Sequence, residues 1–547
     1  MGPPAAPFSL EVLAYKLIQA RPAPARQSSA GGSTAGGDGG SVAPSSRSTG
    51  LPGGGPAGRT ELSAFDQINA FLATARCYGF GPGSCLDAWA LEHALRATVT
   101  DLPFLAGRMG RMRGHRLSTL AIEHTNEGAL FTHVEAEEVS LSVMAPDRWP
   151  QRRMAPADQS DLAFYLEPMD TGRAMLMGRE PLMKVRLTDL KDGQILGITL
   201  SHAILDGVRW PALEAHLGAR YRQFSTPGRP RPDPALLLRP GDRTLLSSAH
   251  VAEQLLGEQA STWSPPPLRI RATLCGYWRL ACQALAAGRR NTEFLMLYLP
   301  RAAAAQLKAL AAQGSRVPGI TTGDAIQAAT ALLLHAALGR PLLPVAPKRM
   351  AVMVQVPTPE GYFGNAVRML DVSLPAGTAQ PLQGDAAGAL AALAGAIRQA
   401  TAAFRSQPEL ALEAMATTEA LVGAPLLRML SHMVGVLQPH ITSVTNYNPQ
   451  VQSIDLGLGA PVFTRQVSMP RARDIAIIRP AVPPFEEGLF IQVCMHPKAA
   501  ERLRRLPLLE ALMPDAMFVG GDAVVQCCGP PKIDSDMFDT SSSSGQQ

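Results

Sequence analysis

An apolar run at residues 194–200 is followed by a short polar stretch and then by an apolar pattern of longer period. The run has the length and β-branched content of a buried strand, and a polar turn at residues 191–193 precedes it. Large apolar side chains then recur at helical spacing from residue 210 to residue 224. Pro211 suits a first helical turn, where its missing N–H would have no partner. The pattern predicts a strand, a turn and a helix.

The predicted turn contains the residues with the clearest chemical potential. Residues 201–207 read Ser-His-Ala-Ile-Leu-Asp-Gly, so His202 follows the strand and Asp206 comes four residues later. A neutral imidazole can accept a proton at pH 7, and a well-placed general base contributes roughly 10²–10⁴-fold to a rate. Asp206 would then hold either the turn or the ring. The spacing alone is more typical of a histidine packed in a core.

Other segments of the chain, in a fixed order, point to one family. Residues 455–461 read Asp-Leu-Gly-Leu-Gly-Ala-Pro, residues 361–367 read Gly-Tyr-Phe-Gly-Asn-Ala-Val, and residues 321–325 read Thr-Thr-Gly-Asp-Ala. Leu-Ser-Ala-Phe-Asp-Gln at 62–67 and Leu-Pro-Phe-Leu-Ala-Gly-Arg at 102–108 precede the histidine. The series resembles the BAHD acyltransferases, whose hallmarks are His-x-x-x-Asp-Gly and a later Asp-Phe-Gly-Trp-Gly. The resemblance covers roughly residues 9–24 and 60–510, and leucines replace both aromatics of the second hallmark.

The resemblance implies an α/β (α+β) fold of two chloramphenicol-acetyltransferase-like domains. Each domain is expected to be a mixed sheet flanked by helices, with the active-site channel between the two. Residues 1–24 would supply the first strand, residues 60–225 the N-terminal domain and residues 291–525 the C-terminal domain, while residues 226–290 would form the crossover linker. Gly, Ser, Ala and Pro dominate residues 25–59, which favours a disordered insertion, and residues 526–547 are expected to be a disordered tail.

The implied reaction moves an acyl group from acyl-CoA to a hydroxyl or amine of a small molecule. His202 would remove the proton of the acceptor, which itself attacks the thioester, so no covalent acyl-enzyme forms. Thr442 is the candidate oxyanion donor, because residues 441–444 resemble an Ile-Thr-Ser-Trp segment of the hydroxycinnamoyl branch, in which the threonine and tryptophan face the acceptor. A structural role is implied for Gly207, Asn365, Asp455, Gly457 and Gly459.

Two departures from the family pattern concern aromatic and basic residues. Val444 stands at the position of the tryptophan, which removes aromatic packing against an acceptor ring. The resemblance also implies that Asp206 orients the motif and pairs with an arginine of the other domain. No arginine occupies the expected place near residues 297–299, although Arg289 and Arg290 lie nearby in the sequence.

Composition limits the classes of protein and partner. A chain of 547 residues with 46% hydrophobic and 17% charged residues has ample material for large cores. The net charge of +5 is dispersed, which does not indicate nucleic-acid binding. Seven cysteines in neither a disulfide nor a zinc-ligand pattern favour a reducing compartment. No run of about 18 apolar residues is evident. We therefore expect a cytoplasmic protein. The resemblance implies a monomer of specialised metabolism, with acyl-CoA as co-substrate and no metal or permanently bound cofactor.

Three alternatives remain open at this point. A plastid location is one, since residues 1–60 contain only Glu11 and Asp38 as acids. Another acyltransferase of the same fold group is the second, either a peptide-synthetase condensation domain or a wax-ester and diacylglycerol acyltransferase. Those enzymes usually carry His-His-x-x-x-Asp-Gly, and Ser201 takes the place of the first histidine here. The third is a noncatalytic BAHD-like protein that binds a partner such as a fatty-acid elongation complex.

Overall fold

The strand and the helix predicted on either side of His202 are both present in the computed structural model. Strand β8 (Gly193–Ser201) is buried along its whole length, which explains its uninterrupted apolar sequence, and helix α7 (Trp210–Ser225) follows the turn. The structure describes residues 11–20, 58–111, 120–141, 165–226, 228, 231–265, 278, 293–338, 349–373, 385–424, 441–446, 454–467, 475–481 and 488–519. The predicted tail at 526–547 and residues 25–57 of the predicted insertion lie outside these residues.

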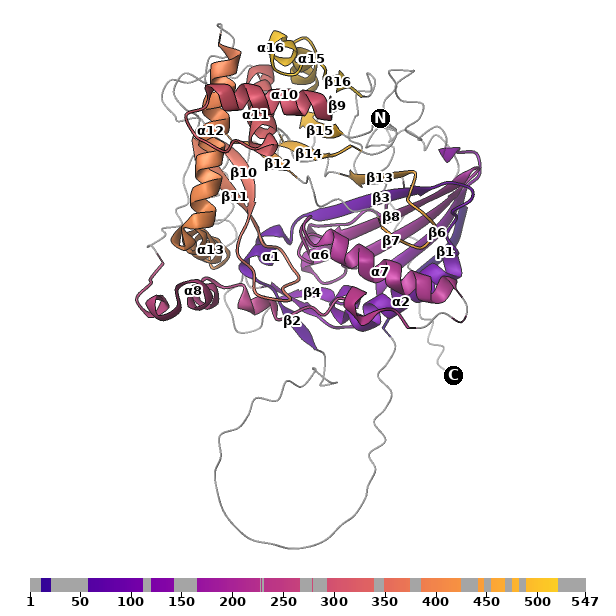
Figure 1. Cartoon of the computed structure of the whole chain (residues 1–547). Coiled ribbons are helices and arrows are strands. Elements are labelled where there is room, and N and C mark those ends of the chain that lie inside the picture. Colours follow the sequence, from indigo (N-terminus) through magenta and orange to yellow (C-terminus); the bar gives the residue numbers. More distant parts are fainter. Residues whose placement is uncertain are drawn as a thin grey trace, which may run out of the picture.

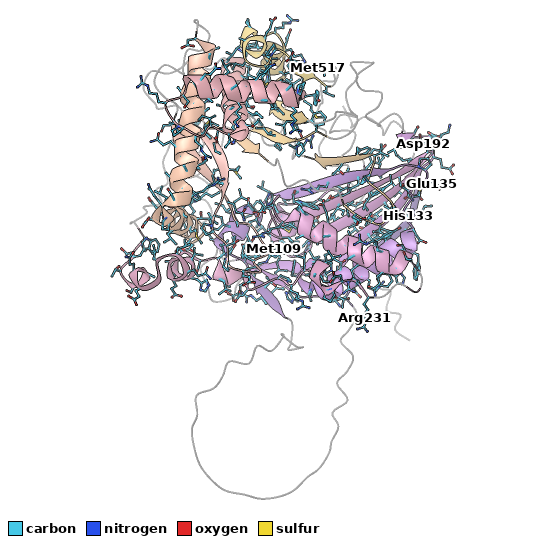
Figure 2. The ribbon with its side chains drawn as sticks, viewed as in Figure 1. Met109, His133, Glu135, Asp192, Arg231 and Met517 are labelled. Atoms are coloured by element: carbon cyan, nitrogen blue, oxygen red, sulfur yellow. The ribbon has the colours of Figure 1, made fainter. Side chains whose placement is uncertain are left out.

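Five strands of the first half of the chain, together with β13 from the second half, form a six-stranded mixed sheet (Figure 1). Its strand order is β1-β6-β7-β8-β3-β13, and within it β6 and β7 run parallel while the other neighbours are antiparallel. β8 begins beside Asp192 at the outer end of this sheet, where His133 and Glu135 also lie (Figure 2), and it ends at the motif turn. The remaining strands are β1 (Glu11–Ile18), β3 (Ala73–Phe80), β6 (Ala129–Ala136), β7 (Met183–Leu190) and β13 (Phe463–Val467).

Helices α2 (Ala88–Asp101) and α7 pack side by side against one face of this sheet (Figure 1). Leu91 and Leu95 of α2 and Leu217 of α7 share a buried cluster with Leu196 of β8. A three-stranded sheet of β2 (Arg59–Glu61), β5 (Leu120–Glu123) and β4 (Arg108–Arg111) accompanies the larger one. The short helices of this half are α1 (Ala64–Asn69), η1 (Pro103–Ala106) and α6 (Arg173–Leu176).

The second half forms a seven-stranded mixed sheet of order β11-β10-β12-β14-β15-β9-β16. β12 runs parallel to both β10 and β14, and the other neighbours are antiparallel. β9 lies between β15 and the short β16, which forms the far edge of the sheet. The bounds are β9 (Glu293–Pro300), β10 (Arg349–Gln355), β11 (Val367–Ser373), β12 (Ile441–Asn446), β14 (Ile475–Pro480), β15 (Gly488–Met495) and β16 (Met517–Phe518).

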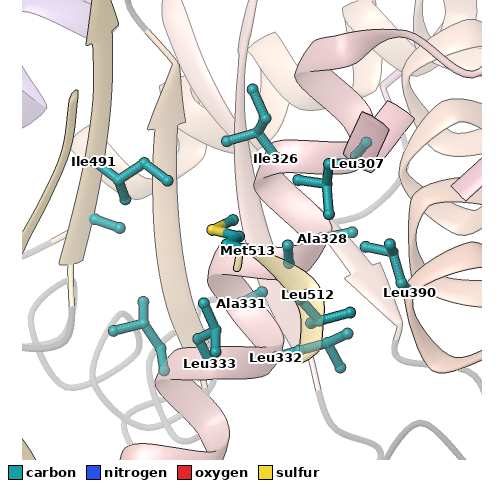
Figure 3. Packing of buried hydrophobic residues seen from close by; sticks show 14 of the residues in the cluster. Leu307, Ile326, Ala328, Ala331, Leu332, Leu333, Leu390, Ile491, Leu512 and Met513 are labelled. Carbon is teal, nitrogen blue, oxygen red and sulfur yellow. The ribbon is translucent and has the colours of Figure 1, made fainter. Parts of the chain in front are cut away.

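The second sheet is covered by helices that are rich in alanine and leucine. Helix α11 (Thr322–Leu338) is buried on nearly every side; its Leu332 and Leu333 lie among side chains of the sheet and of neighbouring helices (Figure 3). Helices buried all round are typical of the centre of a large domain. The other helices of this half are α10 (Arg301–Gly314), α12 (Ala386–Ser406), α13 (Pro408–Val422), α15 (Pro497–Arg504) and α16 (Pro507–Leu512).

Helix α12 differs from the expectation that no segment could span a bilayer. By length and composition alone its 21 residues qualify as a membrane span, and 50% of the qualifying window is buried inside the protein. Leu390, Leu393 and Ile397 belong to the same buried cluster as α10 and α11. An alanine-rich sequence with only two arginines accounts for the match, and the packing is that of a helix in a protein core.

The crossover segment contains short helices rather than an extended linker. η3 (Pro234–Leu236) and η4 (Arg243–Leu245) come first, followed by α8 (Ser248–Leu256) and η5 (Gly257–Ser261). Helix α8 packs on α13, where the Ser248 hydroxyl donates to Glu419 at 2.6 Å. The Leu238 N–H donates to Nδ1 of His216 in α7 at 2.9 Å, so the crossover is attached to both halves. The two sheets confirm the mixed α/β architecture in two domains.

Candidate active site

His202 is held at the end of β8 by contacts that come from distant parts of the chain. Its backbone N–H donates to the carbonyl oxygen of Leu72 at 2.9 Å, beside the start of β3. The half-buried imidazole presents Nδ1 to the side-chain amide of Asn365, with 2.9 Å between Nδ1 and Oδ1. His202 belongs to the first half and Asn365 to the second, so the histidine lies where the two halves meet.

The hydrogen bonds of Asn365 determine which nitrogen of His202 carries the proton. The amide Nδ2 donates to the carboxylate of Asp66 at 2.9 Å and to the carbonyl oxygen of His202 at 2.7 Å. Both partners only accept, so the amide oxygen is the atom that faces the imidazole. Since that oxygen also only accepts, Nδ1 must donate. The lone pair of neutral His202 is therefore on Nε2.

Asn365 itself is fully buried and anchored through its backbone as well. Its N–H donates to the Asp66 carboxylate at 2.7 Å, and the Tyr362 hydroxyl donates to its carbonyl oxygen at 2.8 Å. Burial, with the charge of Asp66, raises the pKa of Tyr362 well above its ordinary value, so the hydroxyl keeps its proton. Sequence reasoning treated Asn365 as structural. The structure shows it in contact with the candidate base, and its place between the two hallmarks was the available signal.

Asp206 holds the turn and not the ring. Its carboxyl oxygens accept from the backbone N–H groups of Ala366 at 2.9 Å, Val208 at 3.0 Å and Arg209 at 3.3 Å. Burial raises the pKa of Asp206, and these N–H groups, together with the nearby His202 and Arg209, oppose that rise. Gly207 completes the turn between Asp206 and two of these donors, Val208 and Arg209. The bond to Ala366 ties the turn to the second half.

The arginine partner that the resemblance implies for Asp206 is not found in the described part of the chain. None of the arginines there forms an ion pair with Asp206, and the basic groups that act on its carboxyl group are His202 and Arg209, both in the motif turn. Arg289 and Arg290, which lie near the expected position in the sequence, are outside the described residues. Three backbone donors satisfy the carboxyl group in place of a guanidinium.

The second motif lies against α7 and stabilises a loop. Asp455 is 74% exposed, and its carboxylate pairs with Arg222 of α7 at 2.9 Å and accepts from the N–H of Gly457 at 2.9 Å. Gly457 and Gly459 have φ angles of 79° and 85°, a region that glycine enters without steric penalty. Leu456 replaces the first aromatic of the hallmark and is buried in the core of the first half.

Thr442 lies in β12, and its backbone is paired in parallel with Met350 of β10. Its role as an oxyanion donor stays a prediction. Among the residues that the structure describes, no group of three or more His, Cys, Asp and Glu side chains is placed to bind a metal ion.

Comparisons with known proteins agree with the fold. Residues 54–216 match the model of a family described as the Transferase family, and no curated protein matches the chain. TRI101 of F. graminearum, solved with coenzyme A and T-2 mycotoxin, is similar at a TM-score of 0.59 and 15% identity, over 85% of this chain and 100% of that one. Vinorine synthase is similar at a TM-score of 0.54 and 14% identity, over 90% of this chain and 96% of that one. A condensation domain of the calcium-dependent antibiotic synthetase is similar at a TM-score of 0.51 and 16% identity, over 84% of this chain and 97% of that one.

At these identities the solved structures establish the fold, and the family model adds the sequence relationship for the part that contains His202. The resemblance of this chain to the BAHD acyltransferases is thus confirmed by the Transferase family match over residues 54–216 and by a fold shared with two BAHD acyltransferases over 85–90% of its length.

Proposed function

We propose that this protein transfers an acyl group from an acyl-CoA thioester to a hydroxyl or amine of a small molecule, with His202 as the general base. The family match and the fold support an acyl-CoA-dependent transferase. TRI101 was solved with coenzyme A and a small-molecule mycotoxin, which supports the same pair of substrate classes here.

The observation that carries the proposal is the contact between Asn365 and Nδ1 of His202. A general base needs a defined lone pair, and a histidine supplies one only if its other nitrogen is held as a donor. Asn365 holds Nδ1 as a donor, because two further hydrogen bonds fix the orientation of its side-chain amide. Nε2 is then the atom that removes the proton of the acceptor.

The reaction proceeds in two proton transfers on the same nitrogen. Nε2 takes the acceptor's proton as its oxygen or nitrogen attacks the thioester carbonyl, and a tetrahedral intermediate forms. When that intermediate collapses, the C–S bond breaks and the imidazolium returns the proton to the leaving thiolate. A donor to the developing oxyanion is typically worth about 10²–10³ in rate, and Thr442 is the residue that we propose for this role.

The proposal is tested by thiol release from a panel of acetyl-, malonyl-, medium-chain, long-chain and p-coumaroyl-CoA with a mixed pool of alcohols and amines. Wild type should release thiol in an acceptor-dependent manner, and His202→Ala should lose about 10²–10⁴-fold while remaining folded. His133→Gln is the matched control, because His133 also contacts a side chain, Asp189, at 2.7 Å but lies at the outer end of the first sheet.

The other outcomes distinguish the alternatives. Equal turnover by wild type and His202→Ala would remove His202 from the mechanism. If folded protein released no thiol from any acyl-CoA, acyl-CoA would not be the donor. Activity with an acyl group on a carrier protein would then indicate condensation-type chemistry. Inactivity with both donors would favour the noncatalytic binding partner.

A further inference from the structure

Arg243 of the crossover reaches into the turn that carries His202. The residue begins η4, and its side chain is 2% exposed. Its Nη1 donates to the carbonyl oxygen of Ala203 at 3.0 Å, and its Nη2 donates to that of Ile204 at 2.9 Å. The planar guanidinium therefore binds two successive carbonyl groups directly after the histidine. Only arginine has donors in the fork that this arrangement requires.

The charge of Arg243 is compensated inside the protein. Its Nη1 lies 3.5 Å from Oδ2 of Asp66, which is 0% exposed, so the two form a buried ion pair. The guanidinium carbon also lies 5.1 Å from the ring centre of Phe104 and 5.9 Å from that of Phe363. A buried charge is stable only with such partners, and losing one partner leaves the other uncompensated.

Asp66 connects this pair to the imidazole. Its Oδ1 accepts both the backbone N–H and the side-chain Nδ2 of Asn365, whose amide oxygen in turn faces Nδ1 of His202. Arg243 thus acts on His202 by two routes, through the carbonyl groups of the turn and through the chain of Asp66 and Asn365. Residues from the first half, the crossover and the second half all take part.

We infer that Arg243 is a positioning residue for His202, and that the crossover segment thereby fixes the catalytic turn. The inference rests on the proposed function. The turn has other attachments, the His202 N–H to Leu72, the His202 carbonyl oxygen to Asn365 and the Asp206 carboxyl to Ala366. None of them reaches the carbonyl oxygens of Ala203 and Ile204. Without the guanidinium these two carbonyls lose buried partners, and the turn can relax. A displacement of about 1 Å at a catalytic group can reduce a rate by roughly 10².

The first experiment compares Arg243→Lys and Arg243→Ala with Arg108→Lys. Arg108 is a matched control, because it is also buried and also donates to two carbonyl groups. Its Nη1 alone binds those of Gly107 and Gly128, at 2.8 Å each. We expect kcat to fall by roughly 10² in the Arg243 variants, while KM for acyl-CoA stays within about threefold. Arg108→Lys should retain kcat even if its thermal midpoint falls.

Chemical rescue of Arg243→Ala by free guanidinium distinguishes a positioning role of Arg243 from a general loss of structure. Millimolar guanidinium should restore part of kcat to Arg243→Ala, because the small cation can bind the same carbonyl groups and Asp66. It should do nothing for Arg108→Lys or for wild type. If Arg243→Ala does not fold, Arg243→Lys alone decides by its kcat. Wild-type kcat in Arg243→Lys, or an equal loss in Arg108→Lys, would overturn the inference.

A second pair of variants tests the route through Asp66. Asp66 and Asp324 sit in equivalent helix-start boxes, in which each carboxylate accepts from the N–H and hydroxyl of Ser63 or Thr321. Of the two carboxylates, only that of Asp66 also contacts Asn365 and Arg243. Asp66→Asn should lower kcat by at least about tenfold, whereas Asp324→Asn should affect stability alone. Equal effects of the two variants on kcat would contradict the route.

A readout without turnover distinguishes failure of the inference from failure of the proposed function. In protein labelled with ¹⁵N-histidine, the His202 signal, assigned by its absence in His202→Ala, reports which ring nitrogen is protonated. Wild type should show protonated Nδ1, and Arg243→Lys should show a mixture of tautomers or a broadened signal. This result would support the inference even if none of the substrates tested reacts, while an unchanged signal together with unchanged kcat would reject it.

Discussion

At the scale of single residues, the candidate site divides its work between two side chains. Asp206 fixes the backbone of the turn through the N–H groups of Ala366, Val208 and Arg209, and Asn365 fixes the ring of His202. Neither task can be performed by the other residue, because the Asp206 carboxyl group is already engaged by these three donors. The histidine therefore depends on both halves of the chain.

Replacing Asp206 by Asn should destabilise the fold and slow the reaction. An amide directs a donor toward at least one of the three backbone N–H groups, which then loses its partner at a cost of about 1–3 kcal/mol. Urea unfolding measures the loss of stability, and thiol release measures the loss of rate. Asp455→Asn is the control, and because Asp455 is exposed its effect should stay within about 1 kcal/mol. Similar stability losses in the two variants would argue against the backbone role of Asp206.

At the scale of elements, α7 joins the two hallmark motifs. It begins three residues after Gly207, and its middle approaches the loop of the second motif so closely that a Cβ at Gly218 would lie 2.2 Å from the carbonyl oxygen of Asp455. Arg222, one turn later, pairs with the Asp455 side chain. The second motif thus supports the helix that follows the first one.

Gly218→Ala should destabilise the protein although alanine is the better helix former. The intrinsic gain is about 1 kcal/mol, whereas the enforced shift of helix or loop costs typically 1–3 kcal/mol. We expect a net loss of up to about 2 kcal/mol in chemical unfolding. Gly83→Ala serves as the control, since nothing lies within 4 Å of a Cβ there. A Gly218→Ala variant more stable than wild type would show that the loop adjusts freely.

The contact between α2 and α7 should make stability depend on pH in the acid range. Burial alone would raise the pKa of Asp101, but His216 at 3.1 Å and Arg220 at 2.7 Å lower it below its ordinary 3.8. A lowered carboxyl pKa contributes stability that is present above the unfolded pKa and is lost as pH falls through the folded pKa. Asp101→Asn should therefore destabilise most above about pH 5 and progressively less toward about pH 2.

Urea unfolding at a series of pH values measures this difference between Asp101→Asn and wild type. Arg220→Gln removes one of the groups that lower the pKa of Asp101. The loss of stability that it causes should therefore also decrease as the pH falls over the same range. A pH-independent difference for both variants would show that the ion pair contributes nothing.

At the scale of the whole molecule, the two halves are joined by more than the crossover. β13 comes from the second half of the sequence and forms the last strand of the first sheet, antiparallel to β3, with Thr464 opposite Tyr78. The Asp66–Asn365 and Asp206–Ala366 hydrogen bonds cross between the halves as well. Removing the second half would leave β3 with an unpaired edge.

Thermal unfolding should accordingly be a single cooperative transition, with calorimetric and van't Hoff enthalpies in agreement. The first sheet cannot complete itself without β13, so the halves should lose structure together. Two separate transitions, or a stable fragment of residues 58–265 expressed alone, would contradict this expectation.

The sequence by itself determined features that depend on neighbours along the chain. The strand before His202 and the helix after it follow from local periodicity and turn chemistry. Ordered motifs were sufficient to recognise the family, and its resemblance covers the segments that form the start of α11 and β15. Tertiary structure decided the partners. Asn365 is 163 residues from His202 and 299 from Asp66, and β13 is far from β3 in sequence. No periodicity encodes such contacts, because they exist only once separate elements have packed and their buried polar groups must find partners.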